Sequence, residues 1–132
     1  MYTSNHLATG VLIAAVCPNP WVGIPLAFVS HIASDMLAEA PPRKKEDRDA
    51  FMIIEWCFIA IILGWVYLFY PEWWYYAACA VSANLMDVWD KTIGNNKWFH
   101  YSWQETIKLT MEMTLLINFL SVVAVIILER II

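Results

Sequence analysis

Apolar residues occur along this chain in five long blocks that are separated by polar connections. The predicted helices run from Asn5 to Val16, Trp21 to Ala40, Ala50 to Tyr70, Trp73 to Asp90 and Thr106 to Leu128. The first helix ends at "CPNP", because the two prolines stop any helix there. Its twelve residues would span only about 18 Å, against about 30 Å for the hydrocarbon core of a membrane.

Composition supports a membrane protein. The apolar share of the chain is 61% and the charged share is 15%, whereas soluble domains average about 45–50% and about 25%. Because the apolar excess is arranged in blocks, the sequence predicts an all-α, polytopic helical membrane protein. We expect four to five membrane helices, the first one short, in a single domain of residues 1–132. The net charge of −4 and the lack of a basic stripe in the sequence predict no nucleic-acid partner.

Basic residues predict the orientation in the membrane. Seven of the eight Lys and Arg residues lie in two connections on the same side: Arg43, Lys44, Lys45, Arg48, Lys91, Lys97 and Lys108. The positive-inside rule makes that side cytoplasmic. The expected location is therefore the cytoplasmic (inner) membrane, with several passes, a cytoplasmic N-terminus and a cytoplasmic loop from Pro41 to Asp49.

Ionisable residues gather at the cytoplasmic side of the predicted bundle. They are His6, His31, Asp35, Glu39, Asp87, Asp90 and His100. His31, Asp35 and Glu39 are spaced by four, so a helix would place them on one face. Charged groups cost at least about 2.5–3.5 kcal/mol near the centre of a membrane, so they normally pair or serve a site.

Imidazole and carboxylate groups together suit Zn²⁺ or Mn²⁺. The predicted metal ligands are His6, His31, Asp35, Asp87 and His100. His31 and Asp35 can chelate one ion, since i and i+4 side chains are neighbours on a helix. A bound ion would lower the pKa of its water. Glu39 or Asp90 would then be the spare carboxylate that takes the proton.

Structural explanations for the same residues remain open. His31 and Asp35 could instead form a neutralised, hydrogen-bonded pair that joins two helices. Glu55 and Glu112 lie near the cytoplasmic ends of their segments and are expected to extend toward the membrane surface. Asn84 is expected to form a hydrogen bond across helices.

Two stretches resemble a known family. "HLATGVLIAAVCPNPWVGIPLAFVSHIASDM" resembles the opening of bacterial and archaeal membrane-bound metal-dependent hydrolases, over residues 5 to 36. The similarity recurs more weakly at "SANLMDVWDKTIGNNKWFHYSW". The resemblance implies a small multi-helix membrane protein with ligands at His6, His31, Asp35, Asp87 and His100, and with Asp90 as a further member.

The chain departs from that family in two places. Relatives often have another histidine shortly after the SHxxxD element, where this chain reads "AEAPPRKKED". They also tend to have proline before the later aspartate, where this chain has Met86. The first departure puts one metal ligand in doubt.

The sequence therefore predicts a metal-dependent hydrolase at the cytoplasmic membrane face, acting on a lipid or headgroup phosphoester. The alternative is a non-catalytic integral membrane subunit, whose polar cluster fastens helices or contacts a partner protein. Membrane lipid is the expected partner, and a homo-oligomer or a larger membrane complex is left open.

Overall fold

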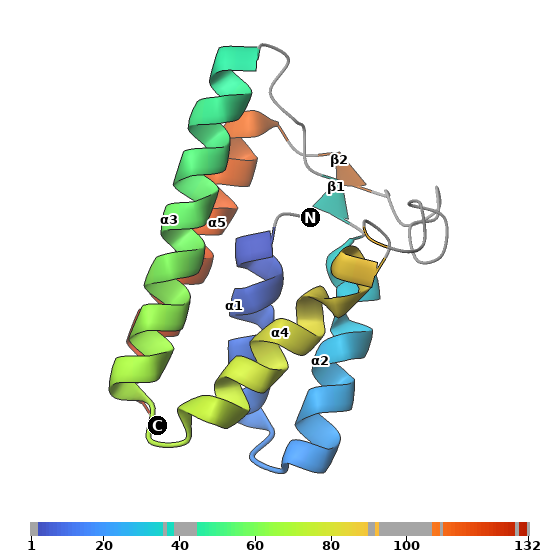
Figure 1. Cartoon of the computed structure of the whole chain (residues 1–132), viewed down its shortest axis with the longest axis vertical. Coiled ribbons are helices and arrows are strands. Elements are labelled where there is room, and N and C mark those ends of the chain that lie inside the picture. Colours follow the sequence, from blue (N-terminus) through green and yellow to red (C-terminus); the bar gives the residue numbers. More distant parts are fainter. Residues whose placement is uncertain are drawn as a thin grey trace.

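The computed structural model of the chain is a bundle of helices (Figure 1). It describes residues 3–35, 37–38, 45–89, 92, 107–108, 110–128 and 130–131. The helices in this part are α1 (Thr3–Val16), α2 (Pro20–Ser34), α3 (Lys45–Phe69), α4 (Trp73–Trp89) and α5 (Met111–Leu128). Two short strands, β1 (Leu37–Ala38) and β2 (Ile107–Lys108), pair in parallel. The all-α prediction is thus confirmed apart from this strand pair.

The break between α1 and α2 falls where the prolines predicted it. Cys17 to Asn19 are not helical, and α2 begins at Pro20. The side chain of Asn19 accepts a hydrogen bond from the backbone N–H of Trp21 at 3.0 Å, which satisfies one of the unpaired donors of the first turn. Proline suits this position because it has no N–H to leave unpaired.

Helix α1 lies in the middle of the bundle and packs against α2, α3, α4 and α5 (Figure 1). Gly10 allows the close approach of α4. A Cβ atom at this position would lie 2.6 Å from Ala80 Cα and would also collide with the carbonyl oxygen of Cys79. Buried residues of α1 such as Leu7 and Val11 complete this contact. The position of α1 therefore determines how the other helices meet.

Two helices are shorter than the sequence predicts. Helix α2 ends at Ser34, where Asp35 takes the C-cap position, and the chain continues as β1. The expectation that Glu39 shares a helical face with His31 and Asp35 is therefore wrong, because the helix has already ended; Glu39 itself lies outside the described residues. Helix α5 begins at Met111, because Ile107–Lys108 pairs with β1 instead of extending the helix.

One helical segment in the described part of the chain, Asp47–Phe69 of α3, is long and apolar enough to cross a membrane. Helix α2 has 15 residues, or about 22 Å, so the predicted crossing by this segment is not supported by its length.

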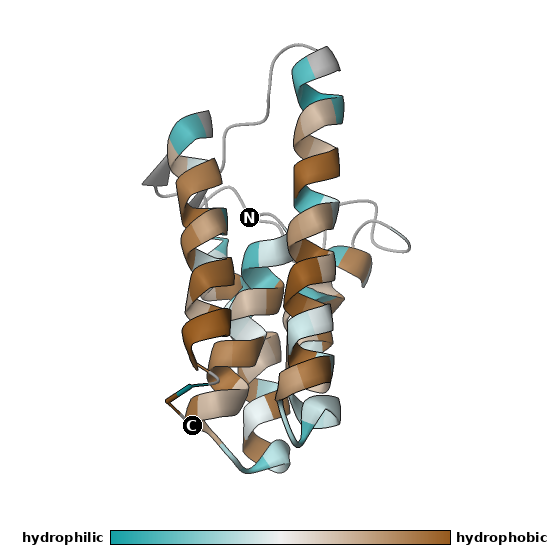
Figure 2. Ribbon diagram, turned by 90° about the vertical axis from the view of Figure 1, so that its left-hand side faces the viewer, coloured by the Kyte–Doolittle hydropathy of each residue, from teal (hydrophilic) through white to brown (hydrophobic). Residues whose placement is uncertain are grey.

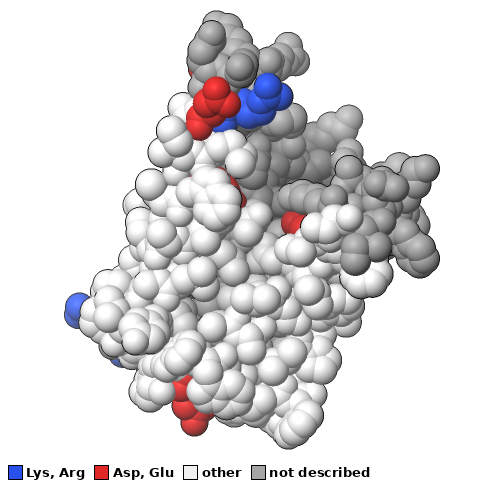
Figure 3. All heavy atoms as spheres, viewed as in Figure 1, with Lys and Arg blue, Asp and Glu red and all other residues white. Residues whose placement is uncertain are grey.

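The outer surface of α3 is apolar. Trp56 is 64% exposed and Leu68 is 70% exposed, and hydrophobic residues dominate the long helices in Figure 2. On the face seen in Figure 3, charged side chains lie mainly in the upper part and along the lower-left margin. Such a surface suits an apolar surrounding over much of the bundle.

Candidate metal centre

Four ionisable side chains from three elements meet at one end of the bundle. They are His6 in the first turn of α1, His31 in the last turn of α2, Asp35 at the C-cap of α2 and Asp87 near the end of α4. Both histidines are fully buried, and Asp35 and Asp87 are only 6% and 7% exposed. The predicted convergence of these four residues is confirmed.

Each imidazole faces both carboxylates. The Nε2 atom of His31 lies 2.9 Å from Oδ2 of Asp35 and 3.6 Å from Oδ1 of Asp87. The Nε2 atom of His6 lies 3.4 Å from Oδ1 of Asp35 and 3.7 Å from Oδ2 of Asp87. The two rings stack with centroids 4.3 Å apart and planes 22° apart. The two Nε2 atoms and four carboxylate oxygens therefore surround one small volume.

A backbone contact orients the ring of His31. Its Nδ1 atom lies 3.0 Å from the carbonyl oxygen of Ala83, on α4. A carbonyl can only accept, so Nδ1 carries the proton and Nε2 of the neutral ring has a lone pair for a cation. Hydrogen bonds of this kind commonly orient metal-binding histidines. Nδ1 of His6 has no such partner among the described residues, so its ring is placed mainly by stacking and by α1.

A divalent cation could balance the charges in this cluster. Two ionised carboxylates buried together require compensation by positive charge. Two imidazolium rings would supply it, but at a separation of 4.3 Å they would repel one another by about 4 kcal/mol at an effective dielectric constant of about 20. One divalent ion supplies the same charge without that repulsion. The carboxyl ends of α2 and α4 also point partial negative charge toward the site.

The ligand atoms are close to the spacing that an ion requires. His6, His31 and Asp87 each offer an atom within 4.8 Å of the others. Ligands of a tetrahedral zinc ion lie about 3.3 Å apart, given bonds of about 2.0–2.1 Å. Shortening these separations by up to about 1.5 Å would therefore let these three residues hold a divalent ion, with Asp35 beside them.

Not all the residues predicted for the site are described by the structure. Glu39, Asp90 and His100 lie outside the described residues, so their roles stay predictions. The expectation for Asn84 is wrong, because its side-chain amide donates to the carbonyl oxygen of Ala80 in its own helix at 3.0 Å.

A second buried polar cluster was not predicted from the sequence. We call it the Glu55 network; it consists of Ser4, Asn5, Glu55 and Asn118. The Oε1 atom of Glu55 accepts a hydrogen bond from the backbone N–H of Ser4 at 2.7 Å, and Oε2 accepts one from Oγ of Ser4 at 2.9 Å. Asn118 donates to Oε2 at 3.3 Å and accepts a hydrogen bond from Asn5. Glu55 is only 5% exposed, so the expectation that it extends to the surface is wrong.

The sequence does contain a signal for this network. Glu55 is the lone charged residue in the apolar block "AFMIIEWCFIA", and Asn118 is the lone amide residue in "TLLINFLSV". A polar group inside an apolar helix is normally hydrogen-bonded to another one. A contact between the two helices through these residues could thus have been predicted from the sequence.

Comparison with family models, with curated proteins and with solved structures finds no match for this chain. The resemblance to membrane-bound metal-dependent hydrolases therefore stays a prediction. The geometry of the cluster is therefore the basis for the function proposed below.

Proposed function

We propose that this chain is a polytopic membrane protein that binds a divalent ion, Zn²⁺ or Mn²⁺, and hydrolyses a lipid or headgroup phosphoester at the cytoplasmic membrane face. The observation that carries the proposal is the convergence of four buried side chains. His6, His31, Asp35 and Asp87 come from three elements and turn two nitrogens and two carboxylates toward one another.

The reaction would divide its tasks between the ion and the chain. A divalent ion supplies Lewis acidity toward water and toward a phosphoester oxygen. His31, oriented by Ala83, and Asp87 would hold the ion. Glu39 and Asp90 are the carboxylates that would accept the proton of the attacking water.

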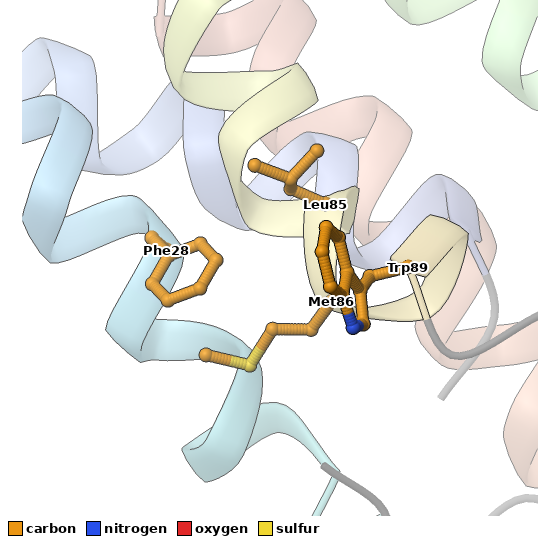
Figure 4. Close-up of a pocket in the computed structure, with 4 residues that line it drawn as sticks. All are labelled: Phe28, Leu85, Met86 and Trp89. Atoms are coloured by element: carbon orange, nitrogen blue, oxygen red, sulfur yellow. The ribbon is translucent and has the colours of Figure 1, made fainter. Parts of the chain in front are cut away.

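An apolar hollow whose lining includes Met86, the neighbour of Asp87 in the chain, favours a lipid as the substrate. Phe28, Leu85, Met86 and Trp89 line a hollow of about 230 Å³ between α2 and α4 (Figure 4). Phe28 precedes His31 by one helical turn, and Met86 directly precedes Asp87. A molecule with a hydrocarbon part in the hollow and an oxygen-rich part at the ion would match both surfaces.

A non-catalytic membrane subunit is the second candidate. The contacts of His6 with Asp35 at 3.4 Å and of His31 with Asp87 at 3.6 Å favour it, because acid–base pairs between helices can fasten them without any ion. In that case the cluster would only join α1, α2 and α4, or present a surface to a partner protein.

Metal content separates the two candidates. The protein is purified in detergent, incubated with Zn²⁺ or Mn²⁺, freed of excess ion and examined by elemental analysis. We expect one ion per chain in the parent and none in a His31→Gln, Asp35→Asn variant that remains in the membrane. Asp49→Asn, which removes an exposed carboxylate of α3, is the control and keeps the ion. A parent that retains no ion would overturn the enzyme proposal and leave the subunit.

Hydrolysis is measured with the ion-loaded parent and vesicles of phosphatidylglycerol and phosphatidylethanolamine. We expect released headgroup phosphate or diacylglycerol by mass spectrometry, and none with the His31→Gln, Asp35→Asn variant. Parent protein that binds the ion but releases no product from these or from a wider panel of phospholipids would overturn the proposed reaction.

The proposed topology has its own test. In a chain without its three cysteines, Cys17, Cys57 and Cys79, a new cysteine replaces Arg48 or Ile131. Arg48→Cys should react only with a reagent admitted to the cytoplasm, and Ile131→Cys with one added outside intact cells. Labelling of both positions from the same side would overturn the topology.

A further inference from the structure

Three consecutive residues of α1 contact three different sets of partners. Ser4 binds Glu55 on α3, Asn5 donates to Asn118 on α5, and His6 faces the carboxylates of the candidate metal centre. Helices α3 and α5 provide none of the four side chains of that centre. They nevertheless contact Ser4 and Asn5, the two residues directly before His6. The Glu55 network and the metal centre thus share one helical turn.

Glu55 contacts the first turn of α1, at the end of the helix. The first backbone N–H groups of a helix have no partner within the helix, and such ends open most easily. Glu55 accepts the backbone N–H of Ser4 at 2.7 Å and its hydroxyl at 2.9 Å. A carboxylate at a helix N-terminus is also favoured by the helix dipole. Glu55 therefore holds the first turn of α1 two residues away from His6.

Glu55 also takes part in the neighbouring hydrogen bonds. Its Oε2 atom accepts from the NH₂ group of Asn118 at 3.3 Å. The oxygen of Asn118 then accepts from the amide of Asn5. This chain reaches the residue next to His6, and it holds α1 at a second point.

We propose that Glu55 is a positioning residue for His6 as a metal ligand, acting through Ser4 and Asn5. The inference depends on the proposed function, because it assumes that the cluster binds a divalent ion. His31 has its own backbone partner in Ala83, whereas Nδ1 of His6 has none among the described residues. Metal ligands must stay within about 0.5 Å of their productive positions, so His6 depends on a fixed α1.

The test is a double-mutant cycle on the full chain in detergent, with Co²⁺ as a spectroscopic probe titrated up to millimolar concentrations. Glu55→Gln keeps the size of the side chain and removes its charge. We expect it to weaken Co²⁺ binding about tenfold in the parent, as outer-shell changes do, and equally in a His31→Ala background. In a His6→Ala background the same change should alter binding by no more than about twofold, because the ligand that Glu55 positions is gone.

Several outcomes would overturn the inference. An equal loss in both histidine backgrounds would make Glu55 a general support of the fold. Unchanged Co²⁺ binding after Glu55→Gln in the parent would reject the inference and leave the metal centre standing. A parent without Co²⁺ or Zn²⁺ binding would remove the proposed function and the inference with it.

Two further variants keep the test decisive. Glu112→Gln makes the same chemical change at an exposed position of α5 and should leave Co²⁺ binding unaltered. If Glu55→Gln fails to fold, Ser4→Ala removes only the hydroxyl contact at 2.9 Å. It should weaken binding less than tenfold, again only where His6 is present; a loss that persists in His6→Ala would contradict the inference.

Discussion

The two buried polar centres at the start of α1 differ in how their carboxylate and imidazole groups are hydrogen-bonded. In the Glu55 network, both carboxylate oxygens of Glu55 accept hydrogen bonds from Ser4, and one of them also accepts from Asn118. In the metal centre, two carboxylates face two stacked imidazoles, and Nδ1 of His6 has no hydrogen-bond partner in the described part of the chain. A carboxylate that is hydrogen-bonded at both oxygens fastens helices, whereas a centre that concentrates charge and lone pairs is suited to a ligand.

The largest effect that separates the two centres is expected in metal affinity. Asp87→Asn should weaken Zn²⁺ binding more than about 100-fold, since loss of a ligand exceeds the 10–100-fold effect of outer-shell changes. Competition with a chromogenic chelator measures this affinity. Asp49→Asn is the control, and an unchanged Zn²⁺ affinity in Asp87→Asn would contradict the assignment of this carboxylate.

Without metal, a change in the Glu55 network should lower the stability of the protein more than a change in the metal centre. In the presence of a chelator, Glu55→Ala should lower the free energy of unfolding by about 2–3 kcal/mol, because buried donors of Ser4 and Asn118 lose their acceptor. The double change Asp35→Asn, Asp87→Asn should cost less than about 1 kcal/mol, since the amide NH₂ groups can donate to Nε2 of the neutral imidazoles and two like charges disappear. Denaturant titration measures both.

Zinc should stabilise the parent but not the Asp35→Asn, Asp87→Asn variant. Zinc at 100 times its dissociation constant adds about 2.7 kcal/mol to the stability of a protein that binds it only when folded. We expect a gain of this kind in the parent and none in the Asp35→Asn, Asp87→Asn variant. Equal destabilisation of both variants in chelator would remove the distinction between the two centres.

A smaller effect is expected where α1 meets α4 outside both centres. Gly10→Ala places a Cβ atom 2.6 Å from Ala80 Cα, so the helices must separate. Such overpacking typically costs about 1–3 kcal/mol. Thermal unfolding should show this loss, and Gly64→Ala is the control because a Cβ atom there meets nothing within 4 Å. Equal unfolding temperatures for the two variants would contradict the close packing of α1 and α4.

The smallest effect is expected at Asn84. Its amide donates to Ala80 at 3.0 Å within its own helix and takes part in neither centre. Asn84→Ala should change the free energy of unfolding by less than about 1 kcal/mol, and Zn²⁺ affinity should change by no more than about twofold. A large loss of Zn²⁺ affinity in this variant would extend the metal centre along α4.

The sequence predicts the metal centre better than the Glu55 network for a physical reason. His31 and Asp35 are related by helical spacing, and the order of the helices places His6 and Asp87 at the same end, so local rules suffice. Glu55 pairs with Ser4 from 51 residues away, and nothing local selects that partner.

The helix ends were missed for the same reason. Pairing of Leu37–Ala38 with Ile107–Lys108 depends on residues far apart in the chain, and it replaces the ends of two predicted helices. Helical periodicity alone carries no information about such a pairing.

X-ray absorption spectroscopy of the zinc-loaded protein in detergent tests the central claim most directly. If His6, His31 and Asp87 hold the ion, the first shell contains nitrogen and oxygen at about 2.0–2.2 Å, with the outer scattering of two imidazole rings. His6→Ala should reduce that imidazole signal to one ring. A first shell with sulfur at about 2.3 Å, or one made of oxygen without any imidazole signal, would contradict the account.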